Sequence, residues 1–193
     1  MPDPSGDAAV IESLVRSAGQ GDAAAFAGLY EAFAPRLRRF LRYQVSDVDT
    51  AEDLLQQVFV KMIEALPRYR AHGVPFAAWV FRIARNLVID TRRTAHPAAP
   101  IELAEDHPAQ DEGPERTAER ADDRARLMVA LDGLPADQRD VLIWRFFGEL
   151  SPMETASAMG RSTEAVRSLQ HRAVLALRTS LAAQGPFSLG GPQ

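Results

Sequence analysis

Apolar residues recur at helical spacing through most of the chain, and no segment alternates apolar and polar residues as a strand would. In the first half, a stripe that follows a candidate helix cap at Asp22 consists of Phe26, Leu29, Tyr30, Phe33, Leu37, Phe40 and Leu41. A second helix is predicted from Thr50, with Asp53 as its capping-box partner, up to the residue before Pro67. These patterns predict long amphipathic helices.

A loop and a third helix follow. The stretch RYRAHGVP (68–75) contains Gly and Pro and predicts a loop. The next helix is predicted from Phe76 to about Arg93, with a buried face of Trp79, Val80, Ile83, Leu87 and Val88. Its other face presents Arg82, Arg85, Asn86, Arg92 and Arg93 to solvent or to a ligand. The first half is therefore predicted to be a compact all-α bundle.

The second half predicts shorter helices. Two of them span 127–134 and 137–147 and end at Pro135 and Gly148. The tetrad SPME (151–154) is a typical helix start, with Ser as the cap, Pro at the first position and Glu closing the capping box.

A helix-turn-helix is predicted after this start. Ala156, Gly160 and Val166 stand at offsets 0, 4 and 10, and Ser162 is placed to cap the second helix. A small residue lets the two helices approach, the glycine supports the turn, and the β-branched residue packs the second helix onto the first.

Charge is distributed unevenly along the 193 residues, whose net charge is −4. Residues 1–94 hold 12 basic and 11 acidic groups, residues 95–126 hold 4 and 9, and residues 127–193 hold 6 and 6. We therefore predict domains over 1–94 and 127–182, a flexible acidic linker over 95–126 whose end enters a helix, and a disordered tail over 183–193. Arginines cluster at 36–42, at 68–93 and at 161–178.

Several function classes are disfavoured. The absence of cysteine removes disulfides, thiolate nucleophiles and Cys-ligated metals, and it fits a reducing cytoplasm. No apolar run approaches the roughly 18 residues of a membrane span, and residues 1–10 lack a signal peptide's features. No HExxH, GxSxG, P-loop or carboxylate pair is present. We expect a cytoplasmic protein that is not an enzyme, with no cofactor, no metal and no membrane insertion.

Two segments together resemble a known family. Residues 53–70 (DLLQQVFVKMIEALPRYR) with 76–93 (FAAWVFRIARNLVIDTRR) resemble region 2 of sigma-70 factors, and residues 134–178 resemble region 4. The chain is similar to the small extracytoplasmic-function (ECF) group, which keeps only these regions. The resemblance implies an all-α protein that directs core RNA polymerase to promoters, opens the −10 element with its first domain and reads the −35 element with its second.

The resemblance also implies protein partners. Asp53, Gln56 and Phe59 would dock on the β′ clamp helices of core polymerase, although Phe59 fits a core position equally well. The β flap of the polymerase is a further expected contact, and an anti-sigma factor wedged between the two domains is an expected regulator. The acidic linker either mimics nucleic acid inside the polymerase or is a simple tether.

For the −10 element, the resemblance points to Tyr69, Arg82, Arg85 and Asn86. An unstacked base needs stacking surfaces, amide hydrogen bonds and arginines that hold its phosphates. Trp79 matches the family too, but its place on the apolar stripe favours a core role. Arg92 and Arg93 are expected either on upstream duplex phosphates or at a solvated helix end.

For the −35 element, matching positions are Arg161, Ser162, Glu164, Arg167, Ser168, His171 and Arg172. Arg161 and Ser162 suit backbone contact at the helix start. His171 has no metal-ligand companion, so a groove contact is preferred and idle surface is the alternative. The family usually has Arg and then Leu after the serine, whereas Leu169 and Gln170 stand here, which leaves the rotation of this helix open.

Two other classes compete with this interpretation. A helix-turn-helix regulator would need a ligand or phosphoacceptor domain, for which residues 1–94 give no pattern. An all-α adaptor would bind other helices in its grooves. Complex formation with core polymerase separates these classes from a sigma factor.

Overall fold

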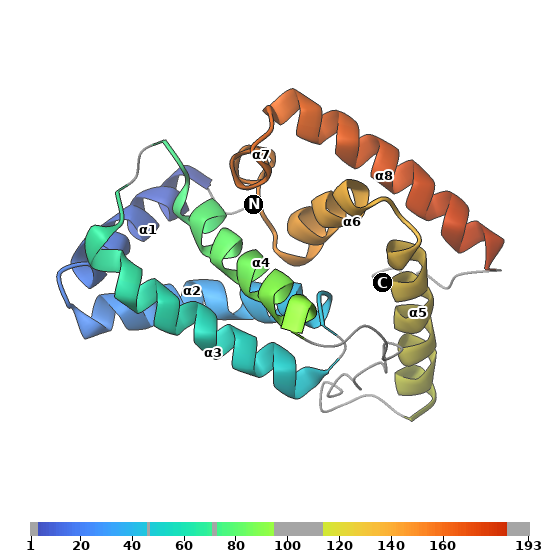
Figure 1. The fold of residues 1–193 in the computed structure, drawn as a ribbon, viewed down its shortest axis with the longest axis horizontal. Coiled ribbons are helices and arrows are strands. Elements are labelled where there is room, and N and C mark those ends of the chain that lie inside the picture. The colour runs from blue at the N-terminus through green and yellow to red at the C-terminus, as the bar shows by residue number, and fades with distance from the viewer. Residues whose placement is uncertain (1–3, 46, 71–72, 95–113, 185–193) are drawn as a thin grey trace.

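The computed structural model describes residues 4–45, 47–70, 73–94 and 114–184, and this part of the chain is helical with no strand (Figure 1). The expected all-α class with two helical domains is therefore confirmed. In chain order the elements are α1 (Pro4–Ala18), α2 (Ala23–Arg42), α3 (Val48–Ala65), the 3-10 turn η1 (Leu66–Arg68), α4 (Phe76–Thr94), α5 (Pro114–Asp132), α6 (Ala136–Leu142), the π-helical turn η2 (Ile143–Phe147), α7 (Pro152–Met159) and α8 (Thr163–Ala183). The expectations for 95–113 and for 185–193 lie outside the described residues.

Helix caps define the starts of α2 and α3. As predicted, the Asp22 carboxylate accepts hydrogen bonds from the backbone N–H groups of Ala24 and Ala25, at 2.9 and 3.2 Å. The predicted start of the next helix at Thr50 is wrong, because Asp47 caps it instead. One oxygen of Asp47 accepts from both the N–H and the hydroxyl of Thr50, at 2.7 and 2.6 Å. These hydrogen bonds also lower the pKa of Asp47.

Helix α1 has no counterpart among the predicted helices. Its apolar residues Ile11, Leu14 and Val15 are only partly buried against the core of the first domain. A weak apolar stripe of this kind gives little periodic signal. In contrast, α2, α3 and α4 supply fully buried residues such as Leu37, Val58 and Val80.

The helix-turn-helix forms as predicted. Ser151 and Glu154 make both hydrogen bonds of a capping box at the start of α7, at 3.1 and 2.7 Å. Gly160 ends α7 with a φ of 66°, a conformation that favours glycine. The Ser162 hydroxyl then accepts from the Ala165 N–H at 3.1 Å and caps α8.

The two domains pack against each other, which the sequence did not predict. Ile143, Trp144 and Leu150 of the second domain belong to the core cluster of the first, and Trp144 is only 1% exposed. Figure 1 shows α7 end-on beside α4, with which it is in contact. A separate cluster that includes Met128, Leu131, Val141, Val166 and Leu169 holds α5, α6 and α8 together.

Candidate nucleic-acid and polymerase interfaces

An open depression of about 730 Å³ lies between α3, α4 and the segment after η1. The charged side chains that line it are Lys61, Glu64, Arg68, Arg70 and Arg82. Tyr69 and Trp79 add aromatic surface. Because four of the five charged groups are basic, the depression combines positive charge with flat rings, the combination that single-stranded nucleic acid requires.

Tyr69 is fixed within an aromatic cluster. Its ring centroid lies 4.7 Å from that of Trp79 and 5.3 Å from that of Phe76. Its hydroxyl donates to the backbone oxygen of Val74 at 3.2 Å, and burial raises the pKa of Tyr69. Trp79 is half-buried and also lines the depression, so it packs on the core while part of its ring faces the depression.

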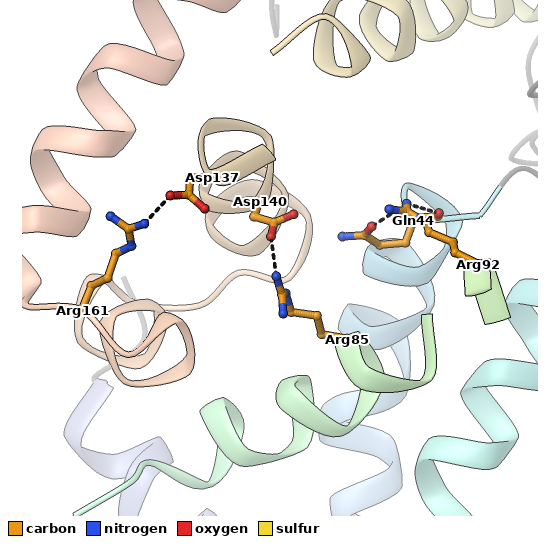
Figure 2. Close-up of polar contacts among 6 residues, drawn as sticks. All are labelled: Gln44, Arg85, Arg92, Asp137, Asp140 and Arg161. Atoms are coloured by element: carbon orange, nitrogen blue, oxygen red, sulfur yellow. Dashed lines mark hydrogen bonds and ion pairs between the residues drawn. The ribbon is translucent and has the colours of Figure 1, made fainter. Parts of the chain in front are cut away.

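The polar face of α4 carries the other residues expected at the −10 element. Asn86 is exposed one helical turn beyond Arg82. Arg85 is paired with Asp140 of the second domain, with 3.1 Å between Nη2 and Oδ2 (Figure 2). Arg85 was expected to contact DNA, but in this structure its guanidinium is paired with a carboxylate of the second domain.

Arg92 and Arg93, at the end of α4, are also engaged. Arg92 donates to the backbone oxygen and to the side-chain oxygen of Gln44, at 2.6 and 2.9 Å (Figure 2). Burial lowers the pKa of Arg92. Arg93 pairs with Asp90 on its own helix at 3.3 Å. Neither guanidinium lies in the depression.

The exposed face of α8 gathers the residues expected at the −35 element. Glu164, Arg167, Ser168, His171 and Arg172 are all exposed. Val166, Leu169 and Ala173 are buried on the opposite side, so Leu169 packs inward. Arg161 precedes the helix and pairs with Asp137 of α6 (Figure 2).

Two of the three residues expected on the polymerase are on the surface. Asp53 and Gln56 are exposed on α3, whereas Phe59 is 5% exposed and its ring packs 4.5 Å from Tyr30. Phe59 thus occupies the core position that was its alternative. Val60, which is 54% exposed, adds an apolar group to the surface of this helix that the sequence pattern did not indicate.

The domain contact uses arginines that the sequence showed only as a cluster. The guanidinium of Arg36 donates to the backbone oxygens of Gly148 and Glu149, at 3.0 and 3.1 Å. Arg39 pairs with the Glu149 carboxylate at 2.5 Å. Tyr43 stacks on Phe147, with 3.6 Å between ring centroids. A run of arginines on α2 was the available signal, but it did not identify the partner.

Two absences hold for the described residues. No group of three His, Cys, Asp or Glu side chains there is placed to bind a metal ion. None of the helices in this part of the chain has the length and apolar character needed to cross a membrane.

A helix-turn-helix with an arginine-bearing exposed face, joined to a helical domain with a basic aromatic depression, is typical of a DNA-binding protein. Comparison with known proteins gives the same division, because the family model for Sigma-70 region 2 matches residues 29–97 and that for Sigma-70 region 4 matches residues 130–179. The chain belongs to the sigma-70 family. Curated ECF sigma factors that are 38% identical over most of this chain show that it belongs to the ECF group of that family. It is an RNA polymerase sigma factor that acts in promoter recognition and transcription initiation, and it is not an enzyme.

Curated relatives and solved structures support the same family. The ECF sigma factor SigD of Mycobacterium tuberculosis (strain ATCC 25618 / H37Rv) is 38% identical over 184 residues, 92% of this chain and 87% of the relative. ShbA of Streptomyces griseus is 38% identical and covers 88% of this chain and 94% of its own. CnrH in complex with the cytosolic domain of CnrY has a TM-score of 0.71 at 25% identity, covering 91% of this chain and 99% of its own. RpoE with the anti-sigma factor NepR from Bartonella quintana has a TM-score of 0.63 at 26% identity, covering 81% and 96%.

Proposed function

We propose that the first domain binds an unstacked base of the −10 element in the depression beside α4. The observation that carries this proposal is the combination of Tyr69, Trp79 and Arg82 around one opening. Stacking on an aromatic ring contributes about 1–3 kcal/mol per base, which offsets a cost of similar size for unstacking it from the duplex. Asn86, exposed on the same helix, would supply amide hydrogen bonds to a base edge.

For the −35 element, we propose readout by the exposed face of α8 in the major groove. Arg167, Ser168, His171 and Arg172 would face base edges, and Arg161 and Ser162 would meet the DNA backbone near the helix start. The N-terminal end of α8 favours a phosphate there, since its N–H groups and helix dipole attract anions. Glu164 lies in the first turn of this face, where a carboxylate is suited to accept a hydrogen bond from cytosine.

For core polymerase, we propose that α3 contacts the β′ clamp helices through Asp53 and Gln56. The exposed side chain of Val60 would add an apolar contact, and the buried Phe59 would support this helix from beneath. The second domain would contact the β flap. Because these contacts require core polymerase, the proposed location is the cytoplasm.

Promoter binding requires the two domains to separate. The −10 and −35 elements lie about 25 base pairs apart, which is about 85 Å along a duplex at about 3.4 Å per base pair. In the structure, by contrast, the two domains are packed together, and Arg85 on α4 contacts Asp140 on α6. We call this the closed arrangement. The 19 residues over 95–113 would reach at most about 65 Å when extended. The remaining distance of about 20 Å is within the size of the domains, since the 19-residue α4 and the 21-residue α8 are each about 30 Å long.

An anti-sigma factor is proposed as a further partner, because CnrH and RpoE are found with such proteins or their domains. A partner wedged between the domains would have to displace Trp144 and Leu150, which are already buried there. A partner bound across the outside of the closed pair would preserve those contacts. We therefore favour a partner that holds the domains together.

Transcription in vitro with core polymerase tests the proposed function. The chain is expected to form a complex with core polymerase and to start transcripts at defined sites on genomic fragments, while binding promoter DNA weakly alone. Tight operator binding without polymerase would indicate a regulator instead, and no effect on polymerase would indicate an adaptor.

Asn86→Ala tests the −10 site within this assay. We expect about tenfold less transcription from duplex promoters, with unchanged affinity for core polymerase and recovery on a template already melted at −10. Gln20→Ala, which removes an exposed carboxamide between α1 and α2, is the control. Equal loss of core binding and promoter opening would remove Asn86 from the −10 site.

A further inference from the structure

Arg145 connects three parts of the second domain. Its Nε donates to the side-chain oxygen of Gln170 on α8 at 3.0 Å, and its Nη1 donates to the backbone oxygen of Leu150, immediately before the α7 cap. Burial lowers the pKa of Arg145, while the nearby Glu154 carboxylate opposes that shift. The guanidinium therefore links the segment just before α7, where the helix-turn-helix begins, to α8.

Gln170 lies at the boundary between the two faces of α8. It is half-exposed, between the buried Leu169 and the exposed His171. At about 100° per residue, it stands about 60° around the helix from Arg167. A side-chain contact at this boundary resists rotation of the helix about its own axis, because rotation in either direction changes the distance between Gln170 and Arg145.

Small rotations matter for base readout. Side-chain tips lie about 6 Å from a helix axis, so a rotation of about 20° moves them by about 2 Å. Hydrogen bonds to base edges tolerate only about 0.5 Å of such movement. The buried face of α8 consists of Val166, Leu169 and Ala173, whose apolar contacts are not directional. The planar guanidinium of Arg145 has N–H donors in fixed directions, so its hydrogen bond to Gln170 constrains the rotation of α8.

We propose that Arg145 and Gln170 are positioning residues that set the rotation of α8, and with it the −35 bases that Arg167 and its neighbours meet. This inference rests on the proposed −35 role of α8. It assigns a function to Gln170, a polar residue at a position where the family resemblance implies an apolar side chain.

The test uses Gln170→Leu, which keeps the approximate size of the side chain but removes the acceptor, and Gln170→Glu, which keeps an acceptor for Arg145. Each variant is assembled with core polymerase and transcribes a promoter pool randomised at −35 with a fixed −10 element. We expect Gln170→Leu to lose about five-fold in discrimination at one or more −35 positions, as suits the loss of one hydrogen bond. Gln170→Glu should retain the wild-type order of preferences.

The matched control is Gln138→Leu, the same change on α6, where the side-chain oxygen is buried and has no hydrogen-bond partner among the described residues. Its −35 preferences should stay unchanged. Combining Arg145→Leu with Gln170→Leu should cost no more discrimination than Arg145→Leu alone, because Arg145→Leu already removes the contact with Gln170. A thermal melt of each variant identifies any loss of folding.

Wild-type preferences in a folded Gln170→Leu variant would overturn the proposal, and so would an equal loss in Gln170→Glu. Failure of the wild-type chain to give promoter-specific transcripts would instead refute the proposed function. The two failures are therefore distinguishable in the same experiment.

Discussion

Asp140→Asn is expected to loosen the closed arrangement of the two domains. The substitution keeps the size of the side chain but removes the negative charge that faces Arg85. Arg85 itself, which the resemblance implies as a −10 contact, stays in place. The remaining domain contacts, including the stack of Tyr43 on Phe147, are untouched. The variant therefore removes the ion pair with Arg85, together with the attraction between Asp140 and Arg92.

The magnitude follows from the exposure of the pair. The Arg85 side chain is 42% exposed and that of Asp140 is 14% exposed, so the pair is only partly screened by solvent. Such a pair contributes about 1 kcal/mol. Since about 1.4 kcal/mol corresponds to a factor of ten, its loss shifts the equilibrium toward separated domains about five-fold. Because Asp140 occupies Arg85 only in the closed form, a −10 strand that contacts Arg85 binds the separated form more tightly. If the closed form dominates, the apparent affinity of the free chain for such a strand rises by up to the same factor.

Two measurements check this prediction. Because the chain has no cysteine, Glu31→Cys with Ala182→Cys gives two unique labelling sites, one in each domain, for distance measurements by energy transfer. Fluorescence anisotropy of a single-stranded −10 oligonucleotide reports binding by the free chain. We expect a larger separated population and tighter binding in Asp140→Asn.

Asp137→Asn is the matched control, since it makes the same charge change on the same helix. Asp137 pairs with Arg161 inside the second domain, so its loss should leave domain separation and −10 strand binding unchanged. Identical separation and binding in Asp140→Asn and the wild type would refute the reasoning. An equal gain in both variants would show that net charge, and not the domain contact, controls binding.

Two other predictions address single contacts. Arg167→Ala should lower discrimination at one −35 base pair by about 1–3 kcal/mol in competition binding by the holoenzyme, whereas Arg178→Ala, exposed further along α8, should not. A uniform loss over all sequences would make Arg167 a phosphate contact. Gly148→Ala would place its Cβ 2.7 Å from Phe81 and 2.9 Å from the Trp144 backbone oxygen, so it should lower the free energy of unfolding by about 1–3 kcal/mol in denaturant melts. Gly133→Ala, with its nearest atom at 3.6 Å, is the control, and equal stability of the two variants would argue against close packing at Gly148.

Local chemistry made much of the fold predictable. The caps at Asp22, Ser151 and Ser162 and the turn glycine Gly160 act on groups within a few residues, and the structure has each of them. The start of α3 was predicted wrongly at Thr50, because Asp47, three residues earlier, accepts hydrogen bonds from both donors of Thr50. Helix α1 was missed because its apolar face is only half-buried.

The candidate site was predictable only in part. The exposed face of α8 follows from helical periodicity, since Val166 and Leu169 fix the buried side. The contact from Arg145 to Gln170 joins residues 25 positions apart, and no local pattern indicates it. For Phe59, the sequence allowed either a polymerase contact or a core position. Only the packing of α2 on α3, which places Phe59 against Tyr30, decided between them.

By itself, the sequence determined the helical class, the helix-turn-helix and the resemblance to regions 2 and 4, because these depend on periodicity, capping and short spacing. Only the tertiary structure decided what the arginines meet. A guanidinium binds a carboxylate as readily as a phosphate, so a basic cluster does not identify its partner. Arg85 faces Asp140, 55 residues away, because Trp144 and its neighbours bury their apolar surface against α2 and α4.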